Sequence, residues 1–424
     1  MSEIRKVCII DGSRIPFCRS GSKYMGVSNK ELMSTALKSL VTKLSLEGKV
    51  VGEVSLGAVS KHAADFALAR ECTIESGLSF ETPAFDIQMA CGTSLEAAVL
   101  LGNKIALGQI DCAIAGGVDT NSDVPIEFSK KFSDRLLSLN GAKTLGQKLS
   151  ALKGFSPAEL LPKLPAVKEA RTGKSMGESC EEMAKRWKVS RFEQDQLALE
   201  SHQKAEAAYQ EGFFDDLVTP CSGVKKDNIV RGDTSLEKLN KLRTAFDKSS
   251  NGTLTAGNSS PLSDGASCVF LCSEDYAKEN NLNVMAYLTY SQSAAVNYID
   301  DEGLLMAPAY AVPKMLKNAN MSLQDFDFYE IHEAFAAQVL CTLKAWEDED
   351  FCKEKLGLDT ALGSIDRAKL NVKGGSVALG HPFAATGARI VTSLAKMLHQ
   401  KGSGKGLISI CTAGGMGVTA ILEK

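Results

Sequence analysis

Four side chains in this sequence are of types that could perform nucleophilic or acid–base chemistry, and each follows an apolar run. Cys91 lies in QMACGTSLEAAVLL, His332 in YEIHEAFAAQ, His381 in GGSVALGHPFAATGAR and Cys411 in ISICTAGGMGVT. A thiol that loses its proton to an imidazole can attack a carbonyl carbon. Strand ends of parallel sheets are where such folds deliver functional groups. The pattern therefore raises the question of a nucleophilic thiol with histidine as its base.

The immediate setting of Cys91 permits two interpretations. A helical pattern starts just after it, and a thiol at the first turn of a helix is favoured as thiolate by unpaired amides and the helix dipole. Free cysteine is also among the most buried residue types, so a structural thiol explains the same residues. Cys411 alone ranks no higher than Cys112, which has a similar context. For His332 and His381 the alternative is a hydrogen-bonded core histidine.

Apolar runs alternate with helical patterns along most of the chain, which predicts an α/β fold with a largely parallel, helix-covered sheet. Two halves echo each other: a helix after CGTS leads to CAIAGGVDT, and a helix after AATG leads to CTAGGMGVT. We expect an N-terminal half over residues 1–120, completed by about 251–276, and a C-terminal half over 277–424. The run SVAL before His381 is expected to be a strand.

Residues 121–250 differ in character and are expected to form an inserted helical domain over a cleft. Apolar residues recur there at loosely helical spacing with lysines between them. Such a pattern suits a helix that lies on a membrane or a partner, and equally a helix packed on its own protein. The apolar positions are Leu136, Leu137, Leu139, Leu145, Leu149, Leu152 and Phe155.

Composition excludes several classes of protein. The formal net charge of -3 gives no basic field for nucleic acid. The N-terminal apolar run VCII is too short for a secretory signal, and no apolar stretch reaches the roughly 18 residues of a membrane span. Twelve cysteines without a CxxC pair favour a reducing compartment, either cytoplasm or an organelle matrix. Cys268 and Cys272 are expected on one face of a strand rather than at a metal.

Taken in order, Cys91, HEAF, GHPFAATGAR and CTAGGMG resemble the thiolase family of acyl-CoA acyltransferases. The resemblance spans the chain and includes SMGESCEEMA and KLRTAFDKSSNGTLTAGNSSPLSDGAS. It implies a duplicated, layered αβαβα fold with a loop domain inserted between the halves. Histidine rather than asparagine at position 332 resembles the degradative branch found in trifunctional fatty-acid oxidation complexes. The implied reaction is thiolysis of 3-oxoacyl-CoA in beta-oxidation.

The resemblance also implies a role for each reactive residue. His381 takes the proton of Cys91, which attacks the 3-keto carbon, while backbone amides of Cys91 and Ala413 hold the oxyanion. Cys411 protonates the departing enolate, whose oxygen is held by His381 and His332. Coenzyme A is a substrate, and no metal or other cofactor is expected.

Substrate contacts and partners are implied in the same way. Arg231 is expected near the adenine or phosphate end of CoA, Ser260 near the pantetheine, and Met176 and Phe335 along the thioester channel. An exposed charge at Arg231, and ordinary core packing of the two apolar residues, are the alternatives. A homodimer or higher homo-oligomer, a complex with a hydratase/dehydrogenase subunit and a peripheral membrane contact are further expectations.

Three other functions are weighed against thiolysis. A biosynthetic thiolase would condense two acetyl-CoA, a ketoacyl synthase would decarboxylate, and a non-catalytic relative would only bind acyl-CoA or lipid. Cys411 argues against the synthase, because decarboxylation needs no thiol to abstract an α-proton. The presence of all four reactive residues argues against the non-catalytic relative.

Overall fold

A computed structural model describes residues 4–163, 168–300 and 302–424. Its central sheet runs β4-β3-β5-β6-β1-β7-β10-β9-β8, with β2 paired to β6. The strands are β1 (Val7–Arg14), β2 (Cys18–Arg19), β3 (Glu53–Leu56), β4 (Ala84–Asp86), β5 (Cys112–Asp119), β6 (Ser263–Ser273), β7 (Ala286–Ala295), β8 (Phe328–Ile331), β9 (Lys405–Thr412) and β10 (Met416–Glu423).

The pairing pattern occurs twice along this sheet. In the first half β3 is parallel to β5, β5 is antiparallel to β6 and β6 to β1. In the second half β8 is parallel to β9, β9 is antiparallel to β10 and β10 to β7. Antiparallel pairing of β1 with β7 joins the halves. The sheet is therefore mixed rather than largely parallel, and the same unit is present twice.

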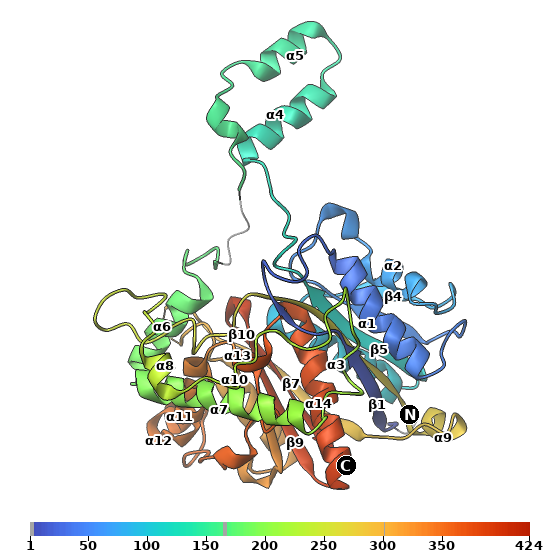
Figure 1. Cartoon of the computed structure of the whole chain (residues 1–424), viewed down its shortest axis with the longest axis vertical. Helices are drawn as coiled ribbons and strands as arrows, with labels where there is room; N and C mark the ends of the chain where they lie inside the picture. Colours follow the sequence, from blue (N-terminus) through green and yellow to red (C-terminus); the bar gives the residue numbers. More distant parts are fainter. Residues whose placement is uncertain (1–3, 164–167, 301) are drawn as a thin grey trace.

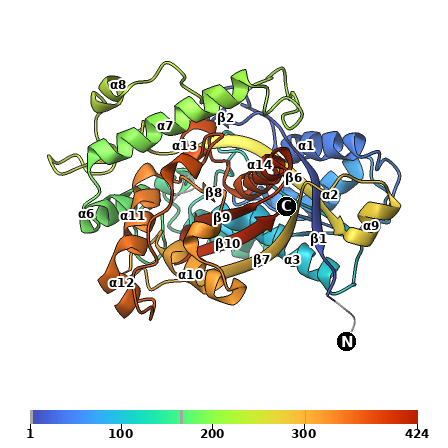
Figure 2. The same ribbon diagram turned by 90° about the horizontal axis from the view of Figure 1, so that it is seen from below.

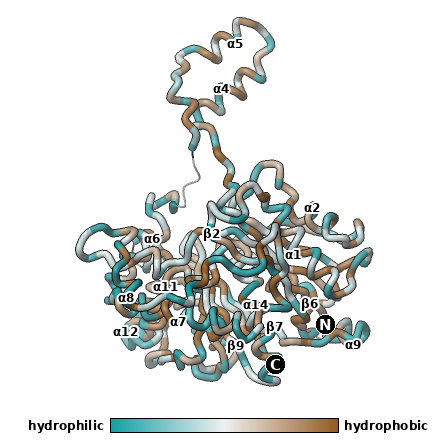
Figure 3. The backbone as a smooth tube through the Cα atoms, viewed as in Figure 1, coloured by the Kyte–Doolittle hydropathy of each residue, from teal (hydrophilic) through white to brown (hydrophobic). Residues whose placement is uncertain are grey.

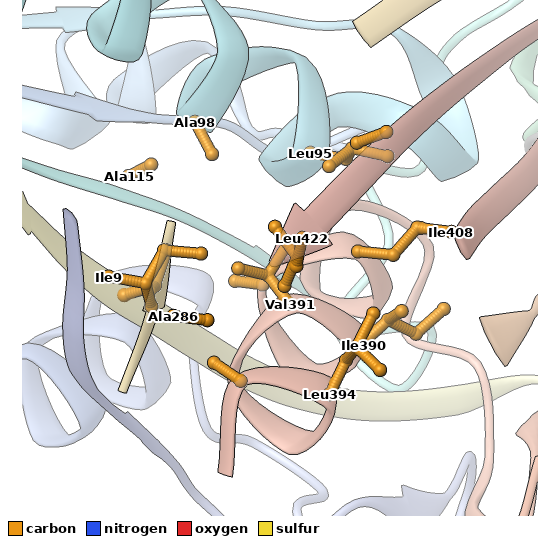
Figure 4. Close-up of a cluster of buried hydrophobic side chains, with 14 of the residues drawn as sticks. Ile9, Leu95, Ala98, Ala115, Ala286, Ile390, Val391, Leu394, Ile408 and Leu422 are labelled. Carbon is orange, nitrogen blue, oxygen red and sulfur yellow. The ribbon is translucent and has the colours of Figure 1, made fainter. Parts of the chain in front are cut away.

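Two helices, α3 (Thr93–Ala106) and α14 (Thr386–Lys401), form the layer between the halves. Side chains of both pack with Ile9, Ala115, Ile408 and other strand residues in one core (Figure 4). The opposite faces are covered by α1 (Asn29–Lys43) and α2 (Leu68–Glu75) in the first half and by α10 (Ala307–Ala319) and α11 (Ala336–Glu347) in the second. This gives the expected α/β/α/β/α order of layers (Figure 2).

The α3–α14 contact is close because of a glycine. A Cβ on Gly387 would lie 2.4 Å from the amide nitrogen of Leu95, so no other residue fits there without a shift. Ser94 reinforces the crossing, since its hydroxyl accepts a hydrogen bond of 2.8 Å from the Ala388 amide. The N-terminal turns of the two helices are thereby fixed side by side.

The segment between β5 and β6 has two parts. Helices α6 (Met176–Arg186), α7 (Arg191–Gln210) and α8 (Leu236–Asn240) lie on the body of the molecule. Helices α4 (Lys130–Gly141) and α5 (Leu145–Leu152) instead form a lobe that projects from it (Figure 1). The expectation that the whole insert covers a cleft is wrong for this lobe. The boundaries predicted at residues 120, 250 and 276 stay predictions.

The remaining helices are short. They are α9 (Glu274–Glu279), α12 (Glu349–Glu354) and α13 (Ser376–Leu379). The last corrects a prediction, because SVAL was expected to be a strand. A short buried apolar run has no periodicity that separates strand from helix. Here the carbonyl of Gly375 accepts from the amides of Ala378 and Leu379, which closes a helical turn.

No helix among the described residues is long and apolar enough to cross a membrane. All twelve cysteines are free thiols, and Cys268 and Cys272 pack in one core cluster on the same face of β6. The prediction that these two thiols share a strand face is confirmed.

Candidate active site

Cys91 is presented by a strained turn. It lies in the 3-10 turn Ala90–Gly92, immediately before α3. Ala90 has φ of 46°, a left-handed conformation that costs a residue with a side chain roughly 1–2 kcal/mol. The Thr93 hydroxyl accepts a hydrogen bond from the Met89 amide and donates one to the Ala90 carbonyl, which holds the turn. The turn directs the sulfur away from α3 into a cluster of C-terminal residues.

His381 is the nearest of these residues. Its Nε2 lies 3.1 Å from Cys91 Sγ, and its Nδ1 lies 2.6 Å from the hydroxyl of Thr386. The Thr386 hydroxyl in turn donates to the Pro382 carbonyl at 3.2 Å, so its oxygen is free to accept from Nδ1–H. That arrangement leaves a lone pair on His381 Nε2 facing the thiol. It also gives Nδ1–H, the Thr386 hydroxyl and the Pro382 carbonyl each a hydrogen-bond partner. His381 is therefore arranged as an acceptor for the Cys91 proton.

His332 lies beside His381 at the end of β8. Its ring centroid lies 4.1 Å from that of His381, and its Nδ1 lies 2.9 Å from the hydroxyl of Ser376. Its Nε2 is buried and has no hydrogen-bond partner among the described residues. Glu333, the next residue, accepts from Asn371 and Ser201 side chains and from the Val377 amide. The glutamate of HEAF therefore fixes α13 rather than entering the cavity.

The strand end after β9 supplies the fourth group. Cys411 is buried, and a Cβ on Gly92 would lie 3.0 Å from Cγ2 of Thr412, so the turn that holds Cys91 meets this strand end. The amide of Ala413 is directed at Cys91, as is the amide of Cys91 itself. Gly414 and Gly415 have φ of 76° and 68°, so this turn needs residues that accept left-handed backbone. All five residues predicted for the reactive centre thus meet in one place.

Burial dominates the electrostatics of the cluster. It raises the pKa of Cys91 to about 12, against the lowering effect of the two amides, and raises the pKa of Cys411 well above its ordinary value. Burial and nearby Arg389 lower the pKa of His381 to about 3 and that of His332 well below 6.5. From the sequence, a thiolate favoured by the helix N-terminus and a buried structural thiol were both open for Cys91. Burial disfavours the charged form of each of the four groups, so it favours neutral thiols and neutral imidazoles in the resting protein.

Three of these groups have the spacing of metal ligands. Sγ of Cys91 and one nitrogen each of His332 and His381 lie within 4.8 Å of one another. Cys91 immediately precedes α3, His381 is hydrogen-bonded to Thr386 at the start of α14, and the buried guanidinium of Arg389 acts on both imidazoles; helix N-termini and a guanidinium attract negative charge and oppose a cation. The electrostatic setting therefore favours oxyanion stabilisation over metal binding.

A cavity of about 670 Å³ adjoins this centre and holds part of the predicted substrate site. Arg231 and Ser260 both line it. Ser260 donates from its amide and its hydroxyl to the carbonyl of Ala334, two residues from His332, which ties the cavity to the catalytic cluster. The other lining residues include Arg19, Asn228, Leu239, Leu242, Phe246, Pro261 and Leu262.

Met176 and Phe335 do not line this cavity. Both pack in the neighbouring core cluster that contains Cys411. Phe246 connects the two regions, because it lines the cavity and its ring meets that of Phe335 at 5.8 Å in an edge-on contact. In the free protein Met176 and Phe335 are therefore surrounded by ordinary core packing, which was the alternative to a place along the thioester channel.

Sequence reasoning missed the residues that support the reactive four. Thr386 and Ser376 hold the histidines, and Asp119 accepts the amide of Ala384 in the turn after His381. His202 lines the cavity of about 670 Å³, and its Nδ1 accepts a hydrogen bond from the Arg231 amide; burial and Arg231 lower the pKa of His202 to about 4. A hydroxyl or carboxyl inside an apolar stretch was the only available signal.

A duplicated α/β fold with a thiol, two imidazoles and a second thiol around one cavity defines an acyltransferase that acts through a cysteine. The chain belongs to the thiolase family. The model of the thiolase N-terminal domain matches residues 7–275 and that of the thiolase C-terminal domain matches residues 282–424.

Relatives with known names cover nearly the whole chain. It is 40% identical to a 3-ketoacyl-CoA thiolase of Pectobacterium carotovorum, over 99% of this chain and 96% of the relative. It is 41% identical to one of Vibrio cholerae, over 99% and 97%. Human mitochondrial 3-ketoacyl-CoA thiolase superposes with a TM-score of 0.82 at 28% identity, over 99% of each chain. A Bacillus anthracis acetyl-CoA acetyltransferase gives 0.82 at 30% identity, over 100% of each.

Proposed function

We propose that this protein is an acetyl-CoA C-acyltransferase that cleaves 3-oxoacyl-CoA with CoA to give acetyl-CoA and a shortened acyl-CoA. The observation that carries the proposal is the 3.1 Å contact between Cys91 Sγ and His381 Nε2, with His332 and Cys411 around it. The full-length relatives named 3-ketoacyl-CoA thiolase support the same reaction, which belongs to fatty-acid beta-oxidation.

In the first half-reaction Cys91 becomes acylated. His381 Nε2 takes the thiol proton as Sγ attacks the 3-keto carbon, and the amides of Cys91 and Ala413 donate to the resulting oxyanion. The C2–C3 bond then breaks and its electron pair goes to C2, which forms the enolate of acetyl-CoA. Cys411 gives its proton to C2. The acyl group remains on Cys91 as a thioester.

In the second half-reaction CoA removes the acyl group. The Cys411 thiolate takes the proton of the CoA thiol, and the CoA sulfur attacks the thioester carbon. Cys91 leaves as thiolate and recovers its proton from His381. Because burial raises the pKa of Cys411 well above its ordinary value, its thiolate is a strong base for CoA. Every group ends in its starting state, and the kinetics are ping-pong.

His332 is proposed to hold the enolate oxygen together with His381. The two ring centroids lie 4.1 Å apart and His332 Nε2 has no partner among the described residues, so both imidazoles are available to donate to one oxygen. The alternative, a biosynthetic acetoacetyl-CoA thiolase, is disfavoured because relatives that are 40–41% identical over nearly the whole chain are named 3-ketoacyl-CoA thiolase.

CoA occupies the cavity beside this centre. Arg231 contacts the phosphates or adenine and Ser260 the pantetheine, as the lining of the cavity allows. Phe335 and Met176 border the acyl end through Phe246. One solved structure of the human mitochondrial enzyme is titled as a complex with CoA, at 27% identity to this chain. No metal or redox cofactor takes part in the proposed steps.

The proposed environment is the cytoplasm or an organelle matrix, which suits the free thiols. The terminal strand β4 of the described sheet offers an edge for a homodimer or higher oligomer. The α4–α5 lobe, partly apolar in Figure 3, has Leu137, Leu145 and Leu149 exposed by 62–74% and suits a membrane surface. A hydratase/dehydrogenase subunit is the expected protein partner.

Thiolysis of 3-oxoacyl-CoA substrates of increasing chain length tests the function. Activity on chains longer than four carbons is expected, together with an acyl adduct on Cys91 seen by mass spectrometry after brief mixing without CoA. Cys91→Ala should abolish both, and Cys221→Ala serves as the matched control because it removes a buried thiol elsewhere. Activity confined to acetoacetyl-CoA, or an adduct on another residue, would contradict the proposal.

A further inference from the structure

Ser376 connects Arg389 to His332 inside the protein. Arg389 Nη2 donates to Ser376 Oγ at 2.8 Å, and the same oxygen lies 2.9 Å from His332 Nδ1. All three side chains are buried. We propose that Ser376, oriented by Arg389, is a positioning residue that holds His332 in the tautomer with its hydrogen on Nε2. The proposal deepens the thiolase mechanism and rests on it, because Nε2–H is the donor required for the enolate oxygen.

The direction of each hydrogen bond follows from what each group can do. A guanidinium only donates, so Ser376 Oγ must accept from Arg389. The hydroxyl has one hydrogen, and within the described chain its only other partner is His332 Nδ1. If Nδ1 donated instead, the hydroxyl hydrogen would be buried without an acceptor, at a cost of about 1–3 kcal/mol. Ser376 therefore donates to Nδ1, and the hydrogen of neutral His332 is on Nε2.

The free end of His332 agrees with this assignment. Its Nε2 is buried and lacks a partner among the described residues, and one ring nitrogen of His332 lies within 4.8 Å of Cys91 Sγ and of a ring nitrogen of His381. An N–H group there is unpaired until a carbonyl or enolate oxygen arrives. Such a preorganised donor is strongest in the transition state, where the oxygen has most charge.

Two hydroxyl residues thus give the two histidines opposite tautomers. Thr386 donates to the Pro382 carbonyl and accepts from His381 Nδ1, which leaves His381 Nε2 as an acceptor. Ser376 accepts from Arg389 and donates to His332 Nδ1, which leaves His332 Nε2 as a donor. The same side-chain type serves as base on one side of the cavity and as oxyanion donor on the other.

The surrounding structure fixes Ser376. Glu333 accepts from the amide of Val377, and Ser201 donates to Glu333 while accepting from the amide of Gly375. Arg389 lies 4.0 Å from the carboxylate of Glu330. Both neighbours of Ser376 along the chain are therefore bound to the same carboxyl network, which restricts where its hydroxyl can point.

The tautomers are directly measurable on the wild-type protein. The chain has only five histidines, so ¹⁵N-histidine labelling with long-range ¹H–¹⁵N correlation is tractable, with His332→Asn and His381→Asn for assignment. We expect hydrogen on Nε2 of His332 and on Nδ1 of His381. Hydrogen on Nδ1 of His332 would overturn the proposal, even if thiolysis itself is confirmed by the activity of the same sample.

Kinetics of Ser376 variants provide the second test. Ser376→Ala should lower kcat about tenfold with little change in KM, less than the ~10²–10³-fold cost of removing a donor outright. Its spectrum should show both His332 tautomers, and Ser376→Thr should restore most of kcat. Ser409→Ala is the matched control. The Ser409 hydroxyl is buried and has no partner in the described chain, and the carbonyl of Ser409 accepts from the His332 amide. Equal kcat and equal His332 spectra in the two alanine variants would refute the role.

Discussion

Asp119 Oδ2 accepts a hydrogen bond of 2.7 Å from the amide of Ala384, which joins the end of β5 to the turn that follows His381. The other carboxyl oxygen accepts from the amides of Val59 and Ser60 at 2.9 Å each. Asp119 and the nucleophile Cys91 both belong to the N-terminal half. Asp119 therefore positions His381, the base that the C-terminal half supplies to Cys91.

Replacing Asp119 should disturb both stability and catalysis. Asp119→Ala leaves three backbone amides without an acceptor, and each buried unsatisfied group costs about 1–3 kcal/mol. We expect the free energy of unfolding in urea to fall by at least about 2 kcal/mol, with slower alkylation of Cys91 by iodoacetamide as His381 shifts. Asp111→Ala, which removes a carboxylate at the surface, is the control. Equal stability of the two variants would contradict the role of Asp119.

The left-handed backbone of Ala90, the residue before Cys91, should cost stability. Ala90→Gly relieves the left-handed conformation but adds backbone entropy to the unfolded chain, so its stability should be equal to or up to about 1 kcal/mol above wild type. Ala90→Val adds a β-branched side chain at the same φ and should be less stable than wild type. Thermal melting of the pair gives the comparison. A Val variant as stable as the Gly variant would show that the turn is not strained.

Acid should destabilise the protein through His202. Its pKa is about 4 in the fold and 6.5 in the unfolded chain, so the unfolded state binds more protons between these values. The contribution of His202 to the free energy of unfolding is fully present above about pH 6.5. It is lost as the pH falls toward 4, by about 1.4 kcal/mol per pH unit. Asp119 and Glu330, whose pKa values are raised by burial to about 7 and about 8, give the opposite slope.

Comparison with a variant isolates the histidine contribution. His202→Gln should unfold in urea with a shallower loss of stability between pH 6 and 5 than wild type, by about 1.4 kcal/mol per unit. Identical slopes for the two proteins would exclude a neutral buried His202.

The α4–α5 lobe should bind anionic membranes without affecting catalysis. Changing Leu137, Leu145 and Leu149 to serine removes exposed apolar surface far from the cavity, so kcat should stay within about twofold while vesicle binding falls. Flotation with vesicles of phosphatidylcholine and an anionic phospholipid measures this. The surface would instead belong to a protein partner if the wild-type protein does not bind vesicles and a hydratase/dehydrogenase subunit covers the lobe.

Sequence reasoning located the reactive residues because their types and short motifs are distinctive. It could not find Ser376, Thr386 or Arg389 as partners of the histidines, since which hydroxyl meets which ring depends on contacts between distant segments. It placed SVAL in a strand because a four-residue apolar run fits either structure. It also left the state of the Cys91 thiol open, because a sequence does not report how much water a thiol loses on folding.

The 3.1 Å contact between Cys91 and His381 spans 290 residues of sequence. During synthesis the N-terminal half and its thiol emerge long before the base, and chains tend to fold from the N-terminus as they are made. In such an intermediate the thiol of Cys91 lacks the imidazole that takes its proton in the finished fold. The complete acyl-transfer centre therefore exists only once α14 and the last strand pair have docked, so assembly of the two halves is also what completes the active site.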